Sequence, residues 1–254
     1  MRLPHGFDHF CNFLKGLENH YVIIGGGAAA ILMADGGLEF RSTKDVDFIV
    51  LGRSDDLITR ILTYVRDGGY KTKEATEGHP RYFRFREPSK QECPHYIEIF
   101  ARNELNLNLE DGQYIIPVKN ELAERLSAIL LDDEYFELIK KNITYSASGI
   151  PLINALANIC LKARAHKEIL ERRLAGDTAA DEKVAQKHLK DIWRIAVVLI
   201  GDESLSLKGR PRVDFDFAYQ SLEKLSDSQF KQVMSGTPTV NKHTLMANLK
   251  KIFQ

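Results

Sequence analysis

Two aspartates separated by one residue are the first feature of this sequence that could carry chemistry. Asp45 and Asp47 open the apolar run DVDFIVL, whose length and β-branched residues predict a strand. Because alternate side chains of a strand point to the same face, the two carboxylates would lie side by side, about 6.6 Å apart at Cα. Like charges so placed repel unless a cation neutralises them, and Mg²⁺ prefers carboxylate oxygens. The pair therefore predicts a divalent-metal site.

Glu98 is the best candidate for a third ligand. It lies in the run YIEIF (Tyr96–Phe100), between two aromatic residues on the same strand face. A lone ionised carboxylate there is costly unless a cation or a hydrogen-bond donor meets it. On a strand beside the aspartates, Glu98 would complete a site in which two metal ions assist in-line phosphoryl displacement. The alternative is a solvated strand start at the aspartates, with Glu98 facing water on an edge strand.

A glycine turn precedes these acids. Gly25, Gly26 and Gly27 follow the short apolar run Tyr21–Ile24 and precede the helix-forming residues Ala28–Ala34. Glycine lets the backbone approach a ligand closely, and a helix N-terminus offers N–H groups to phosphate. The same residues could form only a tightly packed turn. They also fit the dinucleotide-binding pattern G-x-G-x-x-A, but the aspartates stand at the start of the next strand, whereas the ribose-binding acid of that fold stands at the end.

Arg41 and Thr43 precede the aspartates at the same alternation. If the strand begins early, Arg41, Thr43, Asp45 and Asp47 line one face. The guanidinium of Arg41 would then bind phosphate or hold the carboxylates in place. A plain ion pair between Arg41 and an aspartate is equally consistent with the sequence.

A third candidate region lies in the C-terminal half. Pro151 fits the first turn of a helix, and counted from there Lys162 lies about 100° from the middle of the apolar stripe. A lysine on this flank either enters a cleft or covers apolar surface with its stem. The residues around it form the densest basic region of the chain, which could bind RNA or another polyanionic acceptor: Arg164, His166, Lys167, Arg172, Arg173, Lys183, Lys187, His188 and Lys190.

The elements that must position these residues divide the chain into two parts. The pattern predicts an α/β domain over residues 1–150 and a helical domain over residues 151–254. The fold class is α+β, a mixed sheet flanked by helices and followed by helices. Further helices are expected over residues 7–18 and 54–67 and in the tail from Phe215. Strands are expected over residues 82–86, 95–101 and 142–146, with a loop over residues 101–113.

Composition narrows the functional class. The chain has 254 residues, and its 35 Lys and Arg balance its 35 Asp and Glu, which argues against a generally basic nucleic-acid binder and leaves room for a local basic patch. Its three cysteines lie far apart, without the spacing of a disulfide framework or a zinc site, as is usual in a reducing cytosol. The longest apolar run, Ile195–Ile200, is far shorter than the roughly 20 residues of a membrane span. We therefore expect a cytoplasmic protein without a membrane partner.

The glycine turn, the aspartate strand and the Glu98 strand together resemble the DNA polymerase β-like nucleotidyltransferase superfamily. The more detailed pattern G-G-x-A followed by R-x-[S/T]-x-D-[I/V]-D is similar to the AbiEii-type branch, known from toxins of type IV toxin–antitoxin systems. Here it reads Gly25-Gly-Gly-Ala28 and Arg41-Ser-Thr-Lys-Asp45-Val-Asp47. That branch continues with a helix carrying a Lys and an Arg, and with a K-D-x-x-D helix. Lys162 and Arg164 match the first and Lys190-Asp191 match the second, but Arg194 stands in place of the last acid.

The resemblance implies transfer of a nucleoside monophosphate from a nucleoside triphosphate (NTP) to an acceptor hydroxyl. Residues 1–150 would then be the nucleotidyltransferase catalytic α/β domain, and the helical domain of residues 151–254 would contribute to the cleft for the nucleotide and the acceptor. RNA, tRNA in particular, is the favoured acceptor, and a cognate antitoxin is an implied partner. Asp45, Asp47 and Glu98 would be catalytic and would bind Mg²⁺ or Mn²⁺. The triphosphate would be held by Gly25, Gly26, Gly27, Arg41, Thr43, Lys162, Lys190 and Asp191. Three alternatives remain open: a small-molecule nucleotidyltransferase of the antibiotic-modifying type, a dinucleotide-binding protein, and a non-catalytic nucleotide-binding module.

Overall fold

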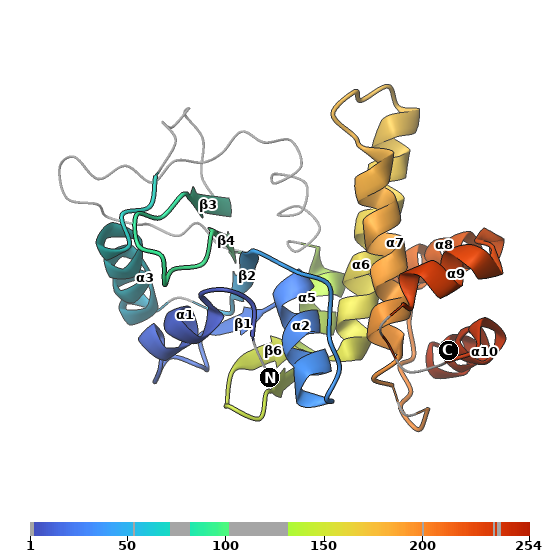
Figure 1. The fold of residues 1–254 in the computed structure, drawn as a ribbon, viewed down its shortest axis with the longest axis horizontal. Helices are drawn as coiled ribbons and strands as arrows, with labels where there is room; N and C mark the ends of the chain where they lie inside the picture. Colours follow the sequence, from blue (N-terminus) through green and yellow to red (C-terminus); the bar gives the residue numbers. More distant parts are fainter. Residues whose placement is uncertain are drawn as a thin grey trace. The chain divides into compact units, whose positions relative to one another are not determined.

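The computed structural model describes residues 3–52, 54–71, 82–101, 132–199, 201–235, 237 and 240–254 (Figure 1). The chain forms two compact units. Unit 1 comprises Met1–Asp35 and Arg41–Ile153, and unit 2 comprises Gly36–Phe40 and Asn154–Gln254. None of the helices in the described ranges is long and apolar enough to cross a bilayer.

Unit 1 is built on a six-stranded mixed sheet with the strand order β3-β4-β2-β1-β6-β5. Strands β2 and β4 run parallel, as do β1 and β6, whereas β1 and β2, β3 and β4, and β5 and β6 are antiparallel pairs. The strands are β1 (Tyr21–Ile23), β2 (Asp45–Val50), β3 (Tyr82–Arg86), β4 (Tyr96–Ala101), β5 (Ile143–Tyr145) and β6 (Pro151–Ile153). The antiparallel β1–β2 pair at the centre excludes the parallel doubly wound sheet of a dinucleotide-binding fold.

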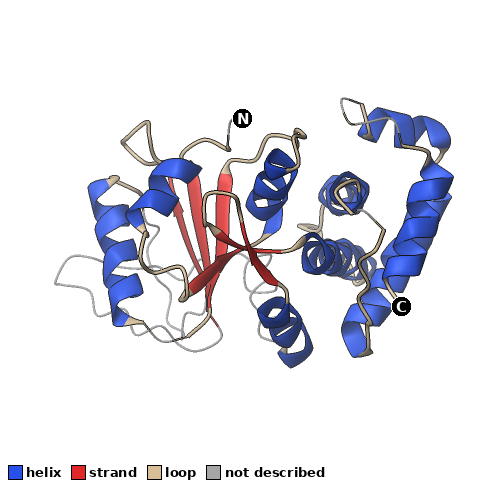
Figure 2. Ribbon diagram, turned by 90° about the horizontal axis from the view of Figure 1, so that it is seen from below, coloured by secondary structure: helices blue, strands red, loops and turns tan. Residues whose placement is uncertain are grey.

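Helices lie on both sides of this sheet (Figure 2). They are α1 (Phe7–Phe13), α2 (Gly25–Asp35), α3 (Asp55–Asp67) and α5 (Asp133–Lys141). Phe10 of α1 packs against Phe48 of β2 and Tyr64 of α3, with ring centroids 5.6 and 5.2 Å apart. This aromatic cluster anchors α1 and α3 to the sheet face opposite the aspartates.

The alternation of β2 produces that division between its two faces. Val46 and Phe48 are fully buried, while Asp45 and Asp47, on the other face, are half-buried. Burying a side chain of this size stabilises the fold by roughly 1.5–3 kcal/mol. The apolar face therefore fixes the strand, and the polar face is held in a defined orientation as a consequence.

Unit 2 is helical. It contains α6 (Ala155–Leu174), α7 (Glu182–Ala196), α8 (Gly209–Lys224), α9 (Asp227–Val233) and α10 (Lys242–Ile252), with α6 packed against both α7 and α8. The fully buried Trp193 of α7 meets Phe230 of α9 edge to face at 4.9 Å, and its indole N–H donates to the sulfur of Met246 at 3.3 Å. Trp193 thus ties α7 to α9 and α10.

The expected α+β class is confirmed, and the strands expected at residues 21–24, 45–51, 82–86, 95–101 and 142–146 are present to within a residue or two. The helix expected over residues 7–18 ends at Phe13 and is followed by a turn through Gly16. Of the loop expected over residues 101–113, all but Ala101, the last residue of β4, lies outside the described residues.

The expectation that Pro151 opens a helix is wrong. Pro151 is the first residue of β6, a position where a proline's missing N–H is tolerated. The helix begins four residues later, after Asn154, whose side chain accepts a hydrogen bond from the N–H of Ala157 at 3.0 Å. An apolar run of this length fits a buried strand or a helix start equally well, and here pairing with β1 and β5 decides for the strand.

Candidate active site

The glycine turn that opens α2 lies directly against Asp47. Gly25 has a φ of +67°, and a Cβ atom at this residue would lie 2.5 Å from Oδ2 of Asp47. The N–H of Ile24, just before the turn, donates to the backbone carbonyl of Asp47 at 2.8 Å. Only glycine fits both the backbone conformation and the space that the carboxylate leaves. The turn therefore brings the N-terminus of α2 to this carboxylate.

The next glycine faces the two residues that precede the aspartates. A Cβ atom at Gly26 would lie 3.0 Å from Oγ1 of Thr43 and 3.7 Å from Nη2 of Arg41. Residues 41–44 are not part of β2, so the strand does not begin early and the four residues do not line one strand face, but Arg41 and Thr43 still reach the turn. Gly27 is different, because its Cβ position lies 2.5 Å from Cζ of Phe7, which makes it a packing contact with α1.

Glu98 lies beside Asp47 on the same face of the sheet. The parallel register of β2 and β4 pairs Asp47 with Glu98 and Asp45 with Tyr96. Paired residues of adjacent strands lie about 4.8 Å apart and point the same way. Glu98 therefore lies directly across from Asp47 in the β2–β4 pair, as expected from the alternation in each strand. The two residues are 51 positions apart in the sequence.

The cation that meets Glu98 is Arg84, which the sequence analysis did not single out. Nε of Arg84 lies 2.9 Å from Oε1 of Glu98, and the two side chains are 30% and 14% exposed. The guanidinium also lies 4.7 Å from the ring centroid of Tyr96. The sequence Tyr-Phe-Arg-Phe-Arg (residues 82–86) contained a signal for this ion pair. If it forms an antiparallel strand beside β4, every second side chain, including that of Arg84, can lie on the same sheet face as Glu98.

The donor chemistry of this face fits a hard divalent cation, since Asp45, Asp47 and Glu98 offer only carboxylate oxygens. Asp45 forms no ion pair with a residue in the described ranges. Within those same ranges, no three or more His, Cys, Asp or Glu side chains are grouped closely enough to hold a metal ion. The metal-ligand roles of the three acids thus stay predictions, and Arg84 already supplies a positive charge at Glu98.

Lys162 of unit 2 is buried. This differs from both interpretations of the sequence, in which its side chain either entered a cleft or covered apolar surface with its stem. It is 5% exposed, and its Nζ lies 3.6 Å from Oδ2 of Asp191, which is fully buried. Nη1 of Arg194 donates to Oδ1 of the same carboxylate at 3.0 Å. Arg194, which replaces an acid in the family pattern, therefore helps Lys162 to neutralise Asp191. Lys190 is half-buried and forms no ion pair with a described residue.

Part of the expected basic region is taken up by structural ion pairs. The fully buried Asp214 of α8 lies 3.1 Å from Nζ of Lys167 and 3.6 Å from Nη1 of Arg164. Burial lowers the pKa of Lys167, but hydrogen bonds to Glu171 and Asp214 outweigh it and raise the pKa overall. Arg172 bonds to Asp177. These α6 cations hold unit 2 together, whereas Arg173 of α6 and Lys183 and Lys187 of α7 are exposed.

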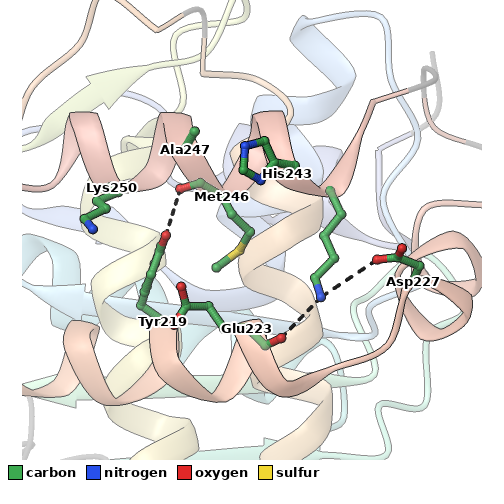
Figure 3. Close-up of a pocket in the computed structure, with 8 residues that line it drawn as sticks. Tyr219, Glu223, Asp227, His243, Met246, Ala247 and Lys250 are labelled. Atoms are coloured by element: carbon green, nitrogen blue, oxygen red, sulfur yellow. Dashed lines mark hydrogen bonds and ion pairs between the residues drawn. The ribbon is translucent and has the colours of Figure 1, made fainter.

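A separate pocket of about 490 Å³ lies between α8, α9 and α10 (Figure 3). Its lining mixes both charges, and the ammonium of Lys242 donates to the carbonyl of Glu223 at 3.3 Å. The lining residues are Tyr219, Glu223, Asp227, Lys242, His243, Met246, Ala247 and Lys250. None of the residues that the sequence singled out for chemistry contributes to it.

Comparisons with known proteins give a likeness to solved structures alone. No family model matches the chain, and no curated protein matches its sequence. Among solved structures, an antigenic nucleotidyltransferase-like protein from Paracoccidioides brasiliensis is similar, with 12% sequence identity and a TM-score of 0.43 over 92% of each chain. A likeness of this size does not transfer an activity, so the chemistry has to be argued from the chain's own residues.

Proposed function

We propose that this chain is a nucleotidyltransferase that transfers a nucleoside monophosphate from an NTP to an acceptor hydroxyl. The observation that carries the proposal is the convergence of Asp47, Thr43 and Arg41 on the Gly25–Gly26 turn at the start of α2. A helix N-terminus beside a guanidinium binds phosphate, and a carboxylate in the same place binds the cation that accompanies a triphosphate. The sequence pattern around these residues gives independent support.

In this mechanism each group has a separate task. The N–H groups at the start of α2, with Arg41 and Thr43, hold and orient the triphosphate so that its α-phosphorus faces the acceptor. Asp45, Asp47 and Glu98 would hold Mg²⁺ or Mn²⁺, which when bound lowers the pKa of the attacking hydroxyl and stabilises the leaving pyrophosphate. Arg84 fixes the direction of the Glu98 carboxylate. The acceptor hydroxyl loses its proton to water, its oxygen forms a bond to the α-phosphorus, and the bond between the α-phosphorus and pyrophosphate breaks, so that pyrophosphate leaves.

The finer parts of the proposal rest on the resemblance of the sequence. RNA, and tRNA in particular, is the acceptor that the AbiEii-like pattern favours, and a role as the toxin of a toxin–antitoxin pair follows from the same pattern. A small-molecule hydroxyl is the competing acceptor. Contact of Lys162 and Asp191 with the triphosphate is implied only by the resemblance, and both side chains are buried in unit 2.

A non-catalytic nucleotide-binding module is the second candidate. It is favoured by one observation, the ion pair between Arg84 and Glu98, which neutralises the third acid without a metal ion. A module of this kind would bind an NTP at the glycine turn and leave it intact. Both candidate functions therefore require NTP binding, and only the nucleotidyltransferase consumes the NTP.

The experiment measures both properties in the same protein. The full chain is incubated with each α-labelled NTP, Mg²⁺ or Mn²⁺ and total cellular RNA, and NTP affinity is measured by equilibrium binding. We expect label to pass to RNA with the wild type. With Asp47→Asn we expect a loss of about 100-fold or more, because the substitution removes a metal-binding charge. Arg84→Lys is the matched control that keeps a cation beside Glu98.

Binding of an NTP by the wild type without transfer to RNA or to small hydroxyl compounds would favour the module. Transfer that survives in Asp47→Asn would remove the proposed role of the aspartate strand. Transfer to small hydroxyl compounds alone would retain the reaction class and replace RNA as the acceptor.

A further inference from the structure

The outer side of α7 carries a row of cations, which we call the basic stripe: Lys183, Lys187, Lys190 and Arg194. Their spacings of four, three and four residues place all of them within about 60° of the helix circumference, at 100° per residue. The opposite side of α7 holds the buried residues Ala185, Leu189, Ile192 and Ala196. The stripe therefore lies on the side of α7 that is turned away from the core of unit 2.

The acidic residues of this region are all directed elsewhere. Glu182 pairs with Arg173 at 3.3 Å, and Asp181 caps the helix by accepting from the N–H of Lys183. Asp191 is buried between Lys162 and Arg194. Lys183, Lys187 and Lys190 form no ion pair with any described residue. Lys183, Lys187 and Lys190 are thus positive charges that no described acid compensates, whereas Arg194 shares its charge with Asp191. They lie in a chain whose net charge is zero.

The like charges of the basic stripe do not stabilise α7, as a comparison with the charges on α6 shows. On α6, opposite charges alternate at i,i+4, with Arg164 near Glu168 and Lys167 bonded to Glu171 at 2.8 Å. On the stripe, like charges follow one another at i,i+4 and i,i+3, which destabilises a helix. A row of cations kept at the expense of helix stability points to an anionic partner.

We propose that the basic stripe binds the phosphate backbone of RNA. The stripe runs over the 12 residues from Lys183 to Arg194, or about 16.5 Å of helix, which suits a linear polyanion with charges at regular intervals better than a single small anion. A helix that lies on a membrane carries apolar side chains beside its basic face, whereas the apolar side chains of α7 are buried in unit 2. RNA is chosen over other linear polyanions on the basis of the proposed function, but the binding surface itself is argued from the charges alone.

The test uses the full chain, fluorescent single-stranded RNA and unfractionated tRNA, with affinity measured by anisotropy over a range of salt concentrations. We expect Lys183→Gln/Lys187→Gln to lower the slope of log affinity against log salt by about 1.4, at 0.7 per phosphate contact in a single strand. Lys183→Glu/Lys187→Glu should weaken binding by about tenfold or more at low salt. Lys15→Glu/Lys90→Glu is the matched control, because both lysines are exposed, lie outside helices and give the same change in net charge.

Two further measurements separate this proposal from the proposed reaction. Asp47→Asn should bind RNA as the wild type does while losing transfer, and the stripe variants should keep the wild-type NTP affinity and melting temperature. RNA binding that is unchanged in the stripe variants, or lowered equally by the control, overturns the proposal. So does preferential binding of the stripe to polyglutamate or to phosphatidylserine vesicles, which would identify an acidic protein or a membrane as its partner. Loss of RNA binding in the stripe variants supports the proposal even where no NTP is turned over.

Discussion

At the scale of the residue, the candidate active site depends on the space left by individual atoms. The absence of a Cβ atom at Gly25 leaves room for the carboxylate of Asp47, and the same absence at Gly26 leaves room for Thr43 and Arg41. Glu98 illustrates a different effect, because its burial between aromatic residues is compensated by Arg84. The site is therefore a set of close approaches that small local changes would disturb.

Gly25→Ala tests the close approach to Asp47. Any L-residue at a φ of +67° costs roughly 1–2 kcal/mol, and the new methyl group would also displace the Asp47 carboxylate. Gly149→Ala is the control, because Gly149 has a φ of +82° and nothing within 4 Å of its Cβ position. We expect both variants to be less stable in urea denaturation, Gly25→Ala by the larger amount, and only Gly25→Ala to lose NTP affinity. Equal losses of stability and unchanged affinity would remove the contact from the site.

At the scale of the element, buried charges join the helices of unit 2. Asp191 of α7 meets Lys162 of α6, and Asp214 of α8 meets Arg164 and Lys167 of the same helix. From the sequence, truncating Lys162 as a surface lysine should cost about 0.5 kcal/mol or less. The buried pair changes that expectation, because removing one partner leaves a buried charge less well compensated.

Lys162→Met is now expected to destabilise the protein by about 1–3 kcal/mol, since the methionine keeps most of the stem while Asp191 loses the ammonium group beside it. Asp191→Asn in the same background should recover part of that loss, which urea denaturation of the single and double variants measures as a coupling energy. Additive losses in the two single variants would mean that Lys162 and Asp191 do not interact.

At the scale of the whole molecule, one buried histidine links stability to pH. His166 of α6 is fully buried, with Nδ1 3.0 Å from the carbonyl oxygen of Ala185, and burial lowers its pKa from the ordinary value of 6.5. Below pH 6.5 the unfolded chain binds a proton at this residue that the folded chain does not bind. Stability is therefore present above that pH and is lost as the pH falls below it.

We expect His166→Gln to flatten this dependence. The wild type should lose stability more steeply than the variant between about pH 6.5 and 5, as measured by urea denaturation at a series of pH values, while the other histidines contribute equally to both proteins. Parallel curves for the two proteins would show that His166 takes up its proton as easily in the folded state as in the unfolded state.

The sequence by itself determined strands β1 to β5, most of the helices and the face on which the acids lie. Periodicity and turn residues are local signals, and they placed β1 to β5 and the glycine turn before α2. Strand alternation also placed Asp45 and Asp47 on one face, and Glu98 on the polar face of its own strand. These properties follow from the covalent order of residues, so they could be predicted without knowing which elements pack together.

Only the tertiary structure decided which groups meet across the fold. The order of the strands put Arg84 beside Glu98, and the packing of α6 on α7 turned Lys162 from an expected flank residue into the buried partner of Asp191. The same packing left Lys183 and Lys187 outside and uncompensated. The physical reason is that burial and charge pairing depend on residues far apart in the sequence, whereas periodicity reports only which side of a strand or helix a residue occupies.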